Sequence, residues 1–171
     1  MEARSDTTPA LDEKALAWRA FLQSHSALLA VLEKELEAEA GMPLSQYEVL
    51  LYLHNSPDGG MRMNDLARSV LLSKSGVTRL VDRLEASGLV QRAESESDRR
   101  VTFARITPAG TQALRDAAPV HMRGVNEHFS RYLTDEEAQV LSGALLRIFR
   151  HAACDLGNAP DLKDFPATEG T

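Results

Sequence analysis

The 171-residue chain contains a single cysteine, Cys154, so no disulfide can form within it. No apolar run approaches the ~20 residues that a membrane-spanning helix requires, and the polar first residues lack the basic-then-apolar pattern of a signal peptide. Zinc-spaced Cys and His pairs, glycine-rich phosphate loops and nucleophile-elbow sequences are missing as well. The sequence therefore predicts a cytoplasmic protein that acts at no membrane, is not an enzyme, and needs no metal or other cofactor.

Positive charge is also scarce, since 19 Lys and Arg stand against 25 Asp and Glu, for a net charge of −6. The deficit is uneven, because the span from Arg62 to Arg105 holds nine basic and six acidic residues, a net charge of +3. A basic middle inside an acidic frame is compatible with phosphate binding by the middle alone. The composition thus permits a nucleic-acid partner without requiring one.

A helix with one buried side and a polar leading end is predicted from Ser73 to Gly88. Its apolar residues recur at the i, i+3, i+4, i+7 spacing of a buried stripe, and they are Val77, Leu80, Val81 and Leu84. A shorter helix that Asn64 caps and that ends near Val70 comes before it. Only residues 71–72 remain for the turn between the two helices, which is the pattern of a helix-turn-helix.

A hairpin of two strands is predicted directly after Gly88. LVQRA at 89–93 and RRVTFARI at 99–106 are strand-like, and the polar sequence ESESD at 94–98 lies between them. A helix-turn-helix followed by such a hairpin is a winged helix. The stretch 61–63 is too short for a strand of its own and could pair only at the edge of a small sheet.

A long amphipathic helix is predicted before this unit. It starts with Thr8 as the N-cap and Pro9 at the first helical position, and it ends at Gly41. A stripe as wide as the one it carries packs more often against several elements, or a second subunit, than against one small core. The stripe consists of Trp18, Phe21, Leu22, His25, Leu28, Leu29, Leu32 and Leu36.

Capping sequences mark the starts of three further helices. Ser45 and Glu48 form a capping-box pair at the start of the second helix, SQYEVLLYLHN. Thr107 precedes a proline in the first helical position, which opens a helix with a kink or break at Pro119. A second capping box, Thr134 with residue 137, opens the last helix.

This order of elements resembles the MarR family of bacterial transcriptional regulators. The match is strongest in LSKSGVTRLVDRLEASGLVQR (72–92) and SDRRVTFARITPAG (97–110), and MNDLA (63–67) and YEVLLYL (47–53) also look like the family. The resemblance covers roughly residues 11 to 155. It implies a homodimer whose first and last helices intertwine and carry two winged-helix lobes. It also implies a repressor of a pseudo-palindromic operator in double-stranded DNA, released when a small molecule binds between lobe and dimer helices.

The predicted fold class is mainly α with a small β-wing, a winged helix-turn-helix domain plus an α-helical dimerisation region built from the N- and C-terminal helices. The N-terminal dimerisation helix is expected at 9–42, the DNA-binding domain at 43–106 and the C-terminal dimerisation helices at 107–156. Residues 1–8 and 157–171 are expected to be disordered.

Candidate DNA contacts lie at the polar end of the Ser73 helix and at the wing. Thr78 and Arg79 are the best candidates for reading bases, because threonine meets the thymine methyl group and arginine reads guanine edges. By resemblance, the wing places an arginine in the minor groove, with Asp98 orienting it. A solvated helix face and a local turn salt bridge are the alternative interpretations. The full set of expected contacts is Ser73, Lys74, Ser75, Thr78, Arg79, Arg83, Arg99 and Arg100.

An effector site that pairs an aromatic ring with a cation would suit a flat organic anion such as a phenolic acid. The candidate lining residues are Trp18, Arg19, His25, Tyr47 and Asp65, and core packing is the alternative role for the tryptophan. His121 and His128 are separated by about two helical turns, ~10 Å, which is too far for one metal ion without other ligands. A protein–protein interaction module and a metal-responsive regulator of the same fold remain the alternative functions.

Overall fold

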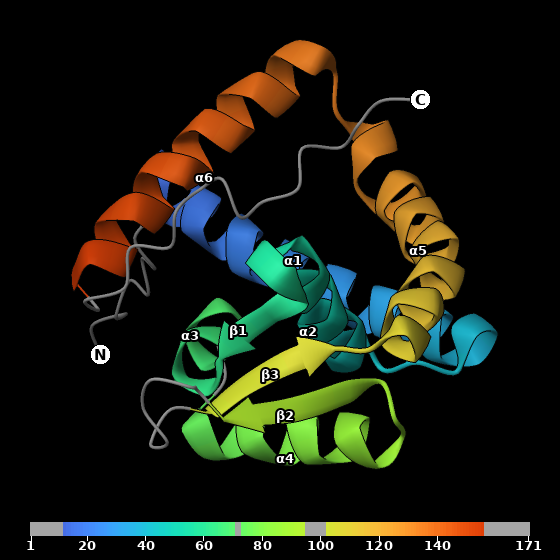
Figure 1. Cartoon of the computed structure of the whole chain (residues 1–171). Coiled ribbons are helices and arrows are strands. Elements are labelled where there is room, and N and C mark those ends of the chain that lie inside the picture. Colours follow the sequence, from blue (N-terminus) through green and yellow to red (C-terminus); the bar gives the residue numbers. More distant parts are fainter. Residues whose placement is uncertain (1–11, 71–72, 95–101, 156–171) are drawn as a thin grey trace, which may run out of the picture.

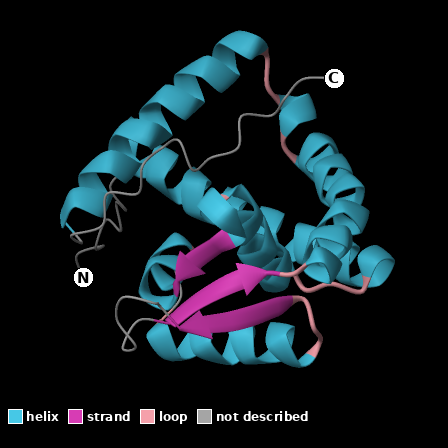
Figure 2. Ribbon diagram, viewed as in Figure 1, coloured by secondary structure: helices cyan, strands magenta, loops and turns pink. Residues whose placement is uncertain are grey.

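Helices surround one small sheet in the middle of the chain (Figures 1 and 2). The computed structural model describes residues 12–70, 73–94 and 102–155. Its elements are α1 (Glu13–Ala40), α2 (Leu44–Asn55), η1 (Pro57–Gly59), β1 (Gly60–Arg62), α3 (Met63–Ser69), α4 (Lys74–Ala86), β2 (Val90–Glu94), β3 (Thr102–Ile106), α5 (Pro108–His128), η2 (Ser130–Tyr132) and α6 (Asp135–Asp155). The predicted fold class, mainly α with a small β-wing, is confirmed.

The sheet has three antiparallel strands in the order β1–β3–β2 (Figure 2). β2 and β3 form the predicted hairpin, with Val90 opposite Ile106 at its base. The third strand, β1, pairs with the other edge of β3 and places Met61 opposite Ala104. The predicted edge stretch therefore pairs one residue earlier than expected, because Met63 already belongs to α3.

The hydrophobic core lies between α2, α3, α4 and the inner face of the sheet, and the start of α5 closes it. The four predicted stripe residues of α4 are all at most 1% exposed. Full burial of such a side chain stabilises the fold by about 1.5–3 kcal/mol relative to an exposed one. This stripe therefore holds α4 in the lobe and leaves its opposite side in solvent.

Both ends of α4 are closed by local hydrogen bonds. At the start, the Ser73 Oγ accepts from the Gly76 N–H at 3.1 Å, as the sequence predicts. At the end, the N–H of Leu89 donates to the Leu84 carbonyl and that of Gly88 to Glu85, both at 2.9 Å. Gly88 has φ +73°, a left-handed conformation that glycine adopts without strain. The chain thus reverses directly from α4 into β2.

Two predicted helix starts, those of α1 and α3, are wrong. α1 begins after Asp12, whose Oδ1 accepts from the Ala15 N–H at 2.7 Å, and not after Thr8, which lies outside the described residues. α3 begins after Arg62 and not after Asn64. The physical reason is pairing of β1 with β3, which holds Arg62 in an extended conformation next to the first helical residue.

The predicted capping box at the start of α2 is also wrong. Pro43 is the N-cap, no side-chain cap bond forms there, and Ser45 is already the second helical residue. The Leu44 N–H donates instead to the Glu33 Oε2 of α1 at 2.7 Å. A carboxylate from a neighbouring helix therefore accepts the hydrogen bond from the start of α2, in place of the predicted pair Ser45 and Glu48.

The two C-terminal helices begin as predicted. Thr107 caps α5, and Pro119 lies inside α5 without ending it, so the predicted break does not occur there. At the start of α6, the Glu137 N–H donates to Thr134 Oγ1 at 3.2 Å and the Thr134 N–H to Glu137 Oε2 at 2.9 Å. This reciprocal pair is the predicted capping box.

Thr107 also joins the sheet to α5. Its N–H donates to the Leu89 carbonyl at 3.0 Å, its Oγ1 donates to the Gly88 carbonyl at 2.7 Å, and it accepts from the Gly110 N–H at 3.0 Å. The first turn of α5 approaches this corner so closely that a Cβ on Gly110 would lie 2.1 Å from the Leu89 oxygen. α5 is therefore fixed to the α4–β2 corner.

The long helices α1 and α6 carry apolar side chains that this chain leaves in solvent. Of the predicted α1 stripe only Leu32 and Leu36 are buried, while Trp18 is 60% exposed. On α6, Val140 is 74% and Ile148 63% exposed. Within the described ranges, no helix has the length and hydropathy to cross a membrane.

Candidate nucleic-acid interface

The outer side of α4 gathers the predicted groove-facing residues on one surface. Lys74, Ser75, Thr78, Arg79 and Arg83 are all exposed. In the part of the chain that the structure describes, no ion pair within 4.0 Å occupies the three cations of this set. Hydroxyls and unpaired positive charges therefore lie together on a helix whose other side is buried.

The first turn of α4 combines backbone N–H groups with short hydroxyl side chains. Ser73 Oγ lies 3.1 Å from Ser75 Oγ, and the helix dipole makes this end attractive to anions such as phosphate. Thr78 Oγ1 donates to the Lys74 carbonyl at 2.8 Å. The hydroxyl hydrogen of Thr78 is thereby used within the helix, which leaves an acceptor oxygen and a methyl group for another partner.

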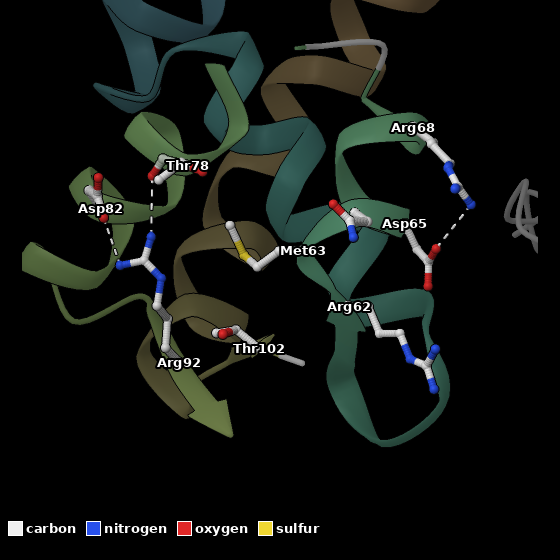
Figure 3. A pocket seen from close by; sticks show the side chains of 9 residues that line it. Arg62, Met63, Asp65, Arg68, Thr78, Asp82, Arg92 and Thr102 are labelled. Atoms are coloured by element: carbon white, nitrogen blue, oxygen red, sulfur yellow. Dashed lines mark hydrogen bonds and ion pairs between the residues drawn. The ribbon is translucent and has the colours of Figure 1, made fainter. Parts of the chain in front are cut away.

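Arg92 of β2 connects the wing to the back of this surface (Figure 3). Its guanidinium Nη1 lies 2.6 Å from Asp82 Oδ1 and 2.8 Å from Glu85 Oε2, and its Nη2 donates to the Thr78 carbonyl at 3.3 Å. Thr78, Asp82 and Arg92 border a hollow of about 660 Å³ between α3, α4 and the strands of the sheet. This contact was not predicted from the sequence, in which Arg92 is one of nine basic residues between Arg62 and Arg105.

The wing arginines of which one is expected to enter the minor groove, Arg99 and Arg100, and Asp98, expected to orient it, lie outside the described residues. The described part of the sheet carries two other arginines beside an aromatic ring, Arg62 on β1 and Arg105 on β3. The guanidinium carbons of Arg62 and Arg105 each lie 5.9 Å from the centre of the Phe103 ring. The outer face of the sheet is therefore basic around Phe103.

The five expected effector residues have different surroundings. Trp18 and His25 lie in one row on α1 with Phe21 between them, each ring centroid 6.1 Å from that of Phe21, and Arg19 is exposed on the same helix. Tyr47 of α2 is only 3% exposed. Asp65 of α3 forms an exposed ion pair with an arginine one turn later and borders the hollow of Figure 3.

Three titratable groups on α2 and α5 have pKa values shifted by burial. Burial lowers the pKa of His121, whose ring centroid lies 4.5 Å from that of Tyr47, and raises the pKa of Tyr47. The pKa of Glu48 is raised, first by burial and then by the nearby charge of Glu33, against the opposing effect of His25. Neutral forms of His121 and Glu48 are thus favoured beside the α1–α2–α5 contact.

His128 meets carboxylates of α1 and α5 and not His121. Its Nε2 lies 2.6 Å from Glu35 Oε1, and ligand atoms of Glu35, Glu127 and His128 all fall within 4.8 Å of one another. Such a set could hold a divalent cation, but an ion pair between α1 and α5 accounts for the contact equally well. Arg123 and Glu39 make a second pair between the same helices.

Comparison with known proteins places this architecture in a family. A family model described as the MarR family matches residues 40–101. The chain is 33% identical over 108 residues to the HTH-type transcriptional regulator MhqR of Bacillus subtilis (strain 168), a match covering 63% of this chain and 72% of that protein. It therefore shares sequence with a bacterial transcriptional regulator over most of that regulator's length.

Two crystal structures from Streptomyces coelicolor are similar in sequence and fold. AbsC, a MarR family transcriptional regulator, is 37% identical with a TM-score of 0.77, covering 85% of this chain and 98% of that one. Sco3205, a MarR family transcriptional regulator solved in complex with DNA, is 31% identical with a TM-score of 0.78, covering 84% and 94%. The chain belongs to the MarR family of transcriptional regulators.

Proposed function

We propose that the chain is a homodimeric, sequence-specific DNA-binding repressor that a small aromatic anion releases from a pseudo-palindromic operator. The observation that carries this proposal is the outer side of α4, where exposed hydroxyls and exposed cations lie on a helix held by a fully buried stripe. A helix of this kind fits the width of the DNA major groove. The proposed DNA-binding domain is 43–106.

The roles on DNA follow from position along α4. Thr78 and Arg79 lie one turn into the helix and are proposed to read base edges. Lys74 and Ser75, with Ser73 at the cap, are proposed to bind phosphate at the helix start, and Arg83 to bind it one turn later. The wing contacts, Asp98 with Arg99 or Arg100, rest on the family resemblance.

The dimer is proposed to form through the exposed apolar residues of α1 and α6, which belong to the segments 9–42 and 107–156. Trp18, Phe21 and Leu22 of α1 and Val140 and Ile148 of α6 are each at least 43% exposed in the single chain. Large apolar side chains exposed in this number on two helices are typical of a surface that a partner covers. A second copy of the chain would cover it and would set two α4 helices about one DNA turn, ~34 Å, apart.

The effector is proposed to bind where the lobe meets the dimerisation helices. Tyr47 and His121 bring two neighbouring rings, tilted by 34° against each other, to the contact of α2 with α5, and Trp18, Arg19 and His25 offer rings and a cation on α1. A flat organic anion is the ligand class that rings beside a cation would recognise. Asp65, on α3, is the remaining proposed residue.

The DNA proposal is tested with duplexes selected by the protein from a random pool. Fluorescence anisotropy would give the dissociation constants for the selected and a scrambled duplex at several salt concentrations. Binding should weaken steeply with salt, because each neutralised phosphate releases counterions. Arg79→Ala should reduce the preference for the selected duplex by roughly 5- to 150-fold, the value of one good base contact.

Arg115→Ala is the matched control, because it removes an exposed arginine from α5, away from α4. This variant should keep the preference of the wild type. Salt-independent binding, or equal losses of preference from Arg79→Ala and Arg115→Ala, would contradict the proposed function.

Sedimentation of the wild type and of Phe21→Glu tests the proposed dimer, since a charge buried in the interface should yield monomers.

A further inference from the structure

We propose that Arg92 is a positioning residue that fixes the rotation of α4 about its own axis, and thereby the sequence specificity, without contacting DNA itself. This inference rests on the proposed DNA-binding function. The residue lies in β2, so the wing strand would set the orientation of the recognition helix. Arg92 is not one of the DNA contacts expected from the sequence.

Arg92 holds α4 at three points on one side. Its backbone N–H donates to Glu85 Oε1 at 3.0 Å, and its Nη1 donates to Glu85 Oε2 at 2.8 Å. The same Nη1 lies 2.6 Å from Asp82 Oδ1, and Nη2 donates to the Thr78 carbonyl at 3.3 Å. Figure 3 shows the guanidinium extended from the strand toward Thr78 and Asp82. We call these contacts the Arg92 clamp.

The three α4 residues of the clamp are spaced i, i+4 and i+7, so they line one edge of the helix over almost two turns. The buried stripe on the neighbouring side fixes how deeply α4 sits, but apolar contact has no direction. Hydrogen bonds to a planar guanidinium do have direction. The clamp therefore adds a directional restraint on rotation to the orientation that the buried stripe sets.

Small rotations of α4 matter because base contacts are short. A rotation of ~20° moves a side-chain end that is about 6 Å from the helix axis by about 2 Å. A displacement of that size breaks a hydrogen bond with an optimum near 2.9 Å. Thr78 belongs both to the clamp, through its carbonyl, and to the proposed base-reading pair, so the two functions meet at one residue.

The charges of the clamp make the proposal testable by the sign of an effect. One guanidinium faces two carboxylates, so the clamp is net negative and its acids repel phosphate. If the clamp had only an electrostatic role, removing Glu85 would strengthen binding to every duplex. If it positions α4, removing Glu85 must weaken the preference for the selected duplex even though a negative charge is lost.

The experiment measures anisotropy on the full chain with the selected and the scrambled duplex. Glu85→Ala should lower the ratio of the two affinities roughly tenfold, the scale of one misplaced base contact. Glu85→Gln, whose single amide oxygen can replace only one of the two carboxylate acceptors, should keep part of that ratio and lie between the wild type and Glu85→Ala. Arg92→Lys keeps the charge but loses the fork of donors, and it should behave like Glu85→Ala. Asp116→Ala, which removes an exposed carboxylate from α5, is the charge control and should keep the ratio.

The outcomes separate this inference from the proposed function. A wild type that binds no duplex in preference to another overturns the proposed function. A wild type that discriminates, together with a Glu85→Ala variant that discriminates equally well and binds both duplexes more tightly, overturns the positioning role alone. An Arg92→Gln variant whose salt slope falls by about one also overturns it, because that loss marks a direct phosphate contact. Circular-dichroism melts are used to choose a temperature at which every variant is folded. If Arg92→Lys does not fold, Glu85→Ala and Glu85→Gln alone are enough to test the positioning role.

Discussion

The contact between the first turn of α5 and the α4–β2 corner predicts a large effect of Gly110→Ala on stability. A Cβ at this position would lie 2.1 Å from the Leu89 carbonyl oxygen and 2.9 Å from an Ile106 side-chain carbon. A carbon and a carbonyl oxygen normally approach no closer than about 3.3 Å. The corner must therefore open by roughly 1 Å to accept one methyl group.

The Leu89 oxygen is not free to move away. It accepts from the Thr107 N–H at 3.0 Å, so retreat weakens this hydrogen bond, and it lies 3.1 Å from the Thr107 hydroxyl, whose hydrogen is shared with the Gly88 carbonyl at 2.7 Å. Overpacking of this kind costs up to about 3 kcal/mol, and the better helix propensity of alanine offsets about 1 kcal/mol of it. We expect a net loss of about 2 kcal/mol in the free energy of unfolding, or a Tm lower by about 4–8 °C.

Two other helical glycines provide the comparison. A Cβ at Gly143 would meet only an Arg147 Nη1 at 3.6 Å, an ordinary contact, so Gly143→Ala should raise the Tm by about 2–4 °C. A Cβ at Gly124 would lie 2.7 Å from both Glu35 Oε2 and Leu32 Cδ2, which are side-chain ends that can shift. Calorimetry at one fixed protein concentration should rank the Tm values Gly143→Ala, Gly124→Ala, Gly110→Ala from highest to lowest. A Tm of Gly110→Ala at or above that of the wild type would refute the reasoning.

Three further predictions concern titration and capping. Burial lowers the pKa of His121 from 6.5, so the stability that neutral His121 contributes is complete above pH 6.5 and declines as the pH falls. Urea titrations between pH 7 and 5 should therefore show a smaller decline in the free energy of unfolding for His121→Phe than for the wild type. Equal declines in the two proteins would contradict this prediction. The pKa of Glu48 is raised from 4.5, so Glu48→Gln should raise the Tm at pH 7 and lose this gain near pH ~4, where the wild-type carboxyl is protonated. Ser73→Ala removes the cap of α4 and should cost about 1 kcal/mol, whereas Ser73→Gly should cost only a few tenths; equal Tm values for the two variants would show that the Gly76 N–H bond is unimportant.

The parts of the fold that the sequence predicts correctly depend on neighbours along the chain. The buried stripe of α4 follows from helical spacing alone, and the caps at Ser73, Thr107 and Thr134 bind backbone groups three residues away. These interactions need no knowledge of tertiary structure. Their signals are therefore complete in a window of a few residues.

The features that sequence reasoning missed depend on contacts between elements. The start of α2 is closed by Glu33, eleven residues earlier and on another helix, which no capping pattern around Ser45 reveals. β1 has only three residues, too few for a strand pattern, and its place follows from pairing with β3. The Arg92 clamp crosses the corner between a helix and a strand, so its acceptors could be identified only once that corner was placed in space.

The same limit applies to the long helices. The sequence marks the α1 stripe as apolar, but the structure shows that the lobe covers it only around Leu32 and Leu36. Spacing reveals which side of a helix avoids water and does not reveal what covers that side. The exposed remainder, with Trp18 at 60%, is therefore information that only the folded lobe provides.

Thr107 is the sole residue between β3 and α5, so the wing and α5 are expected to move together as one rigid unit. α5 has 21 residues and is therefore about 30 Å long. A turn of the DNA-binding lobe by ~10° about Thr107 would carry the far end of α5 through about 5 Å if the helix stays straight. Conversely, contacts that hold the far end of α5 in the proposed dimer would also limit the angle of the wing. The distance between the two α4 helices could then be changed by a contact ~30 Å away from Thr107.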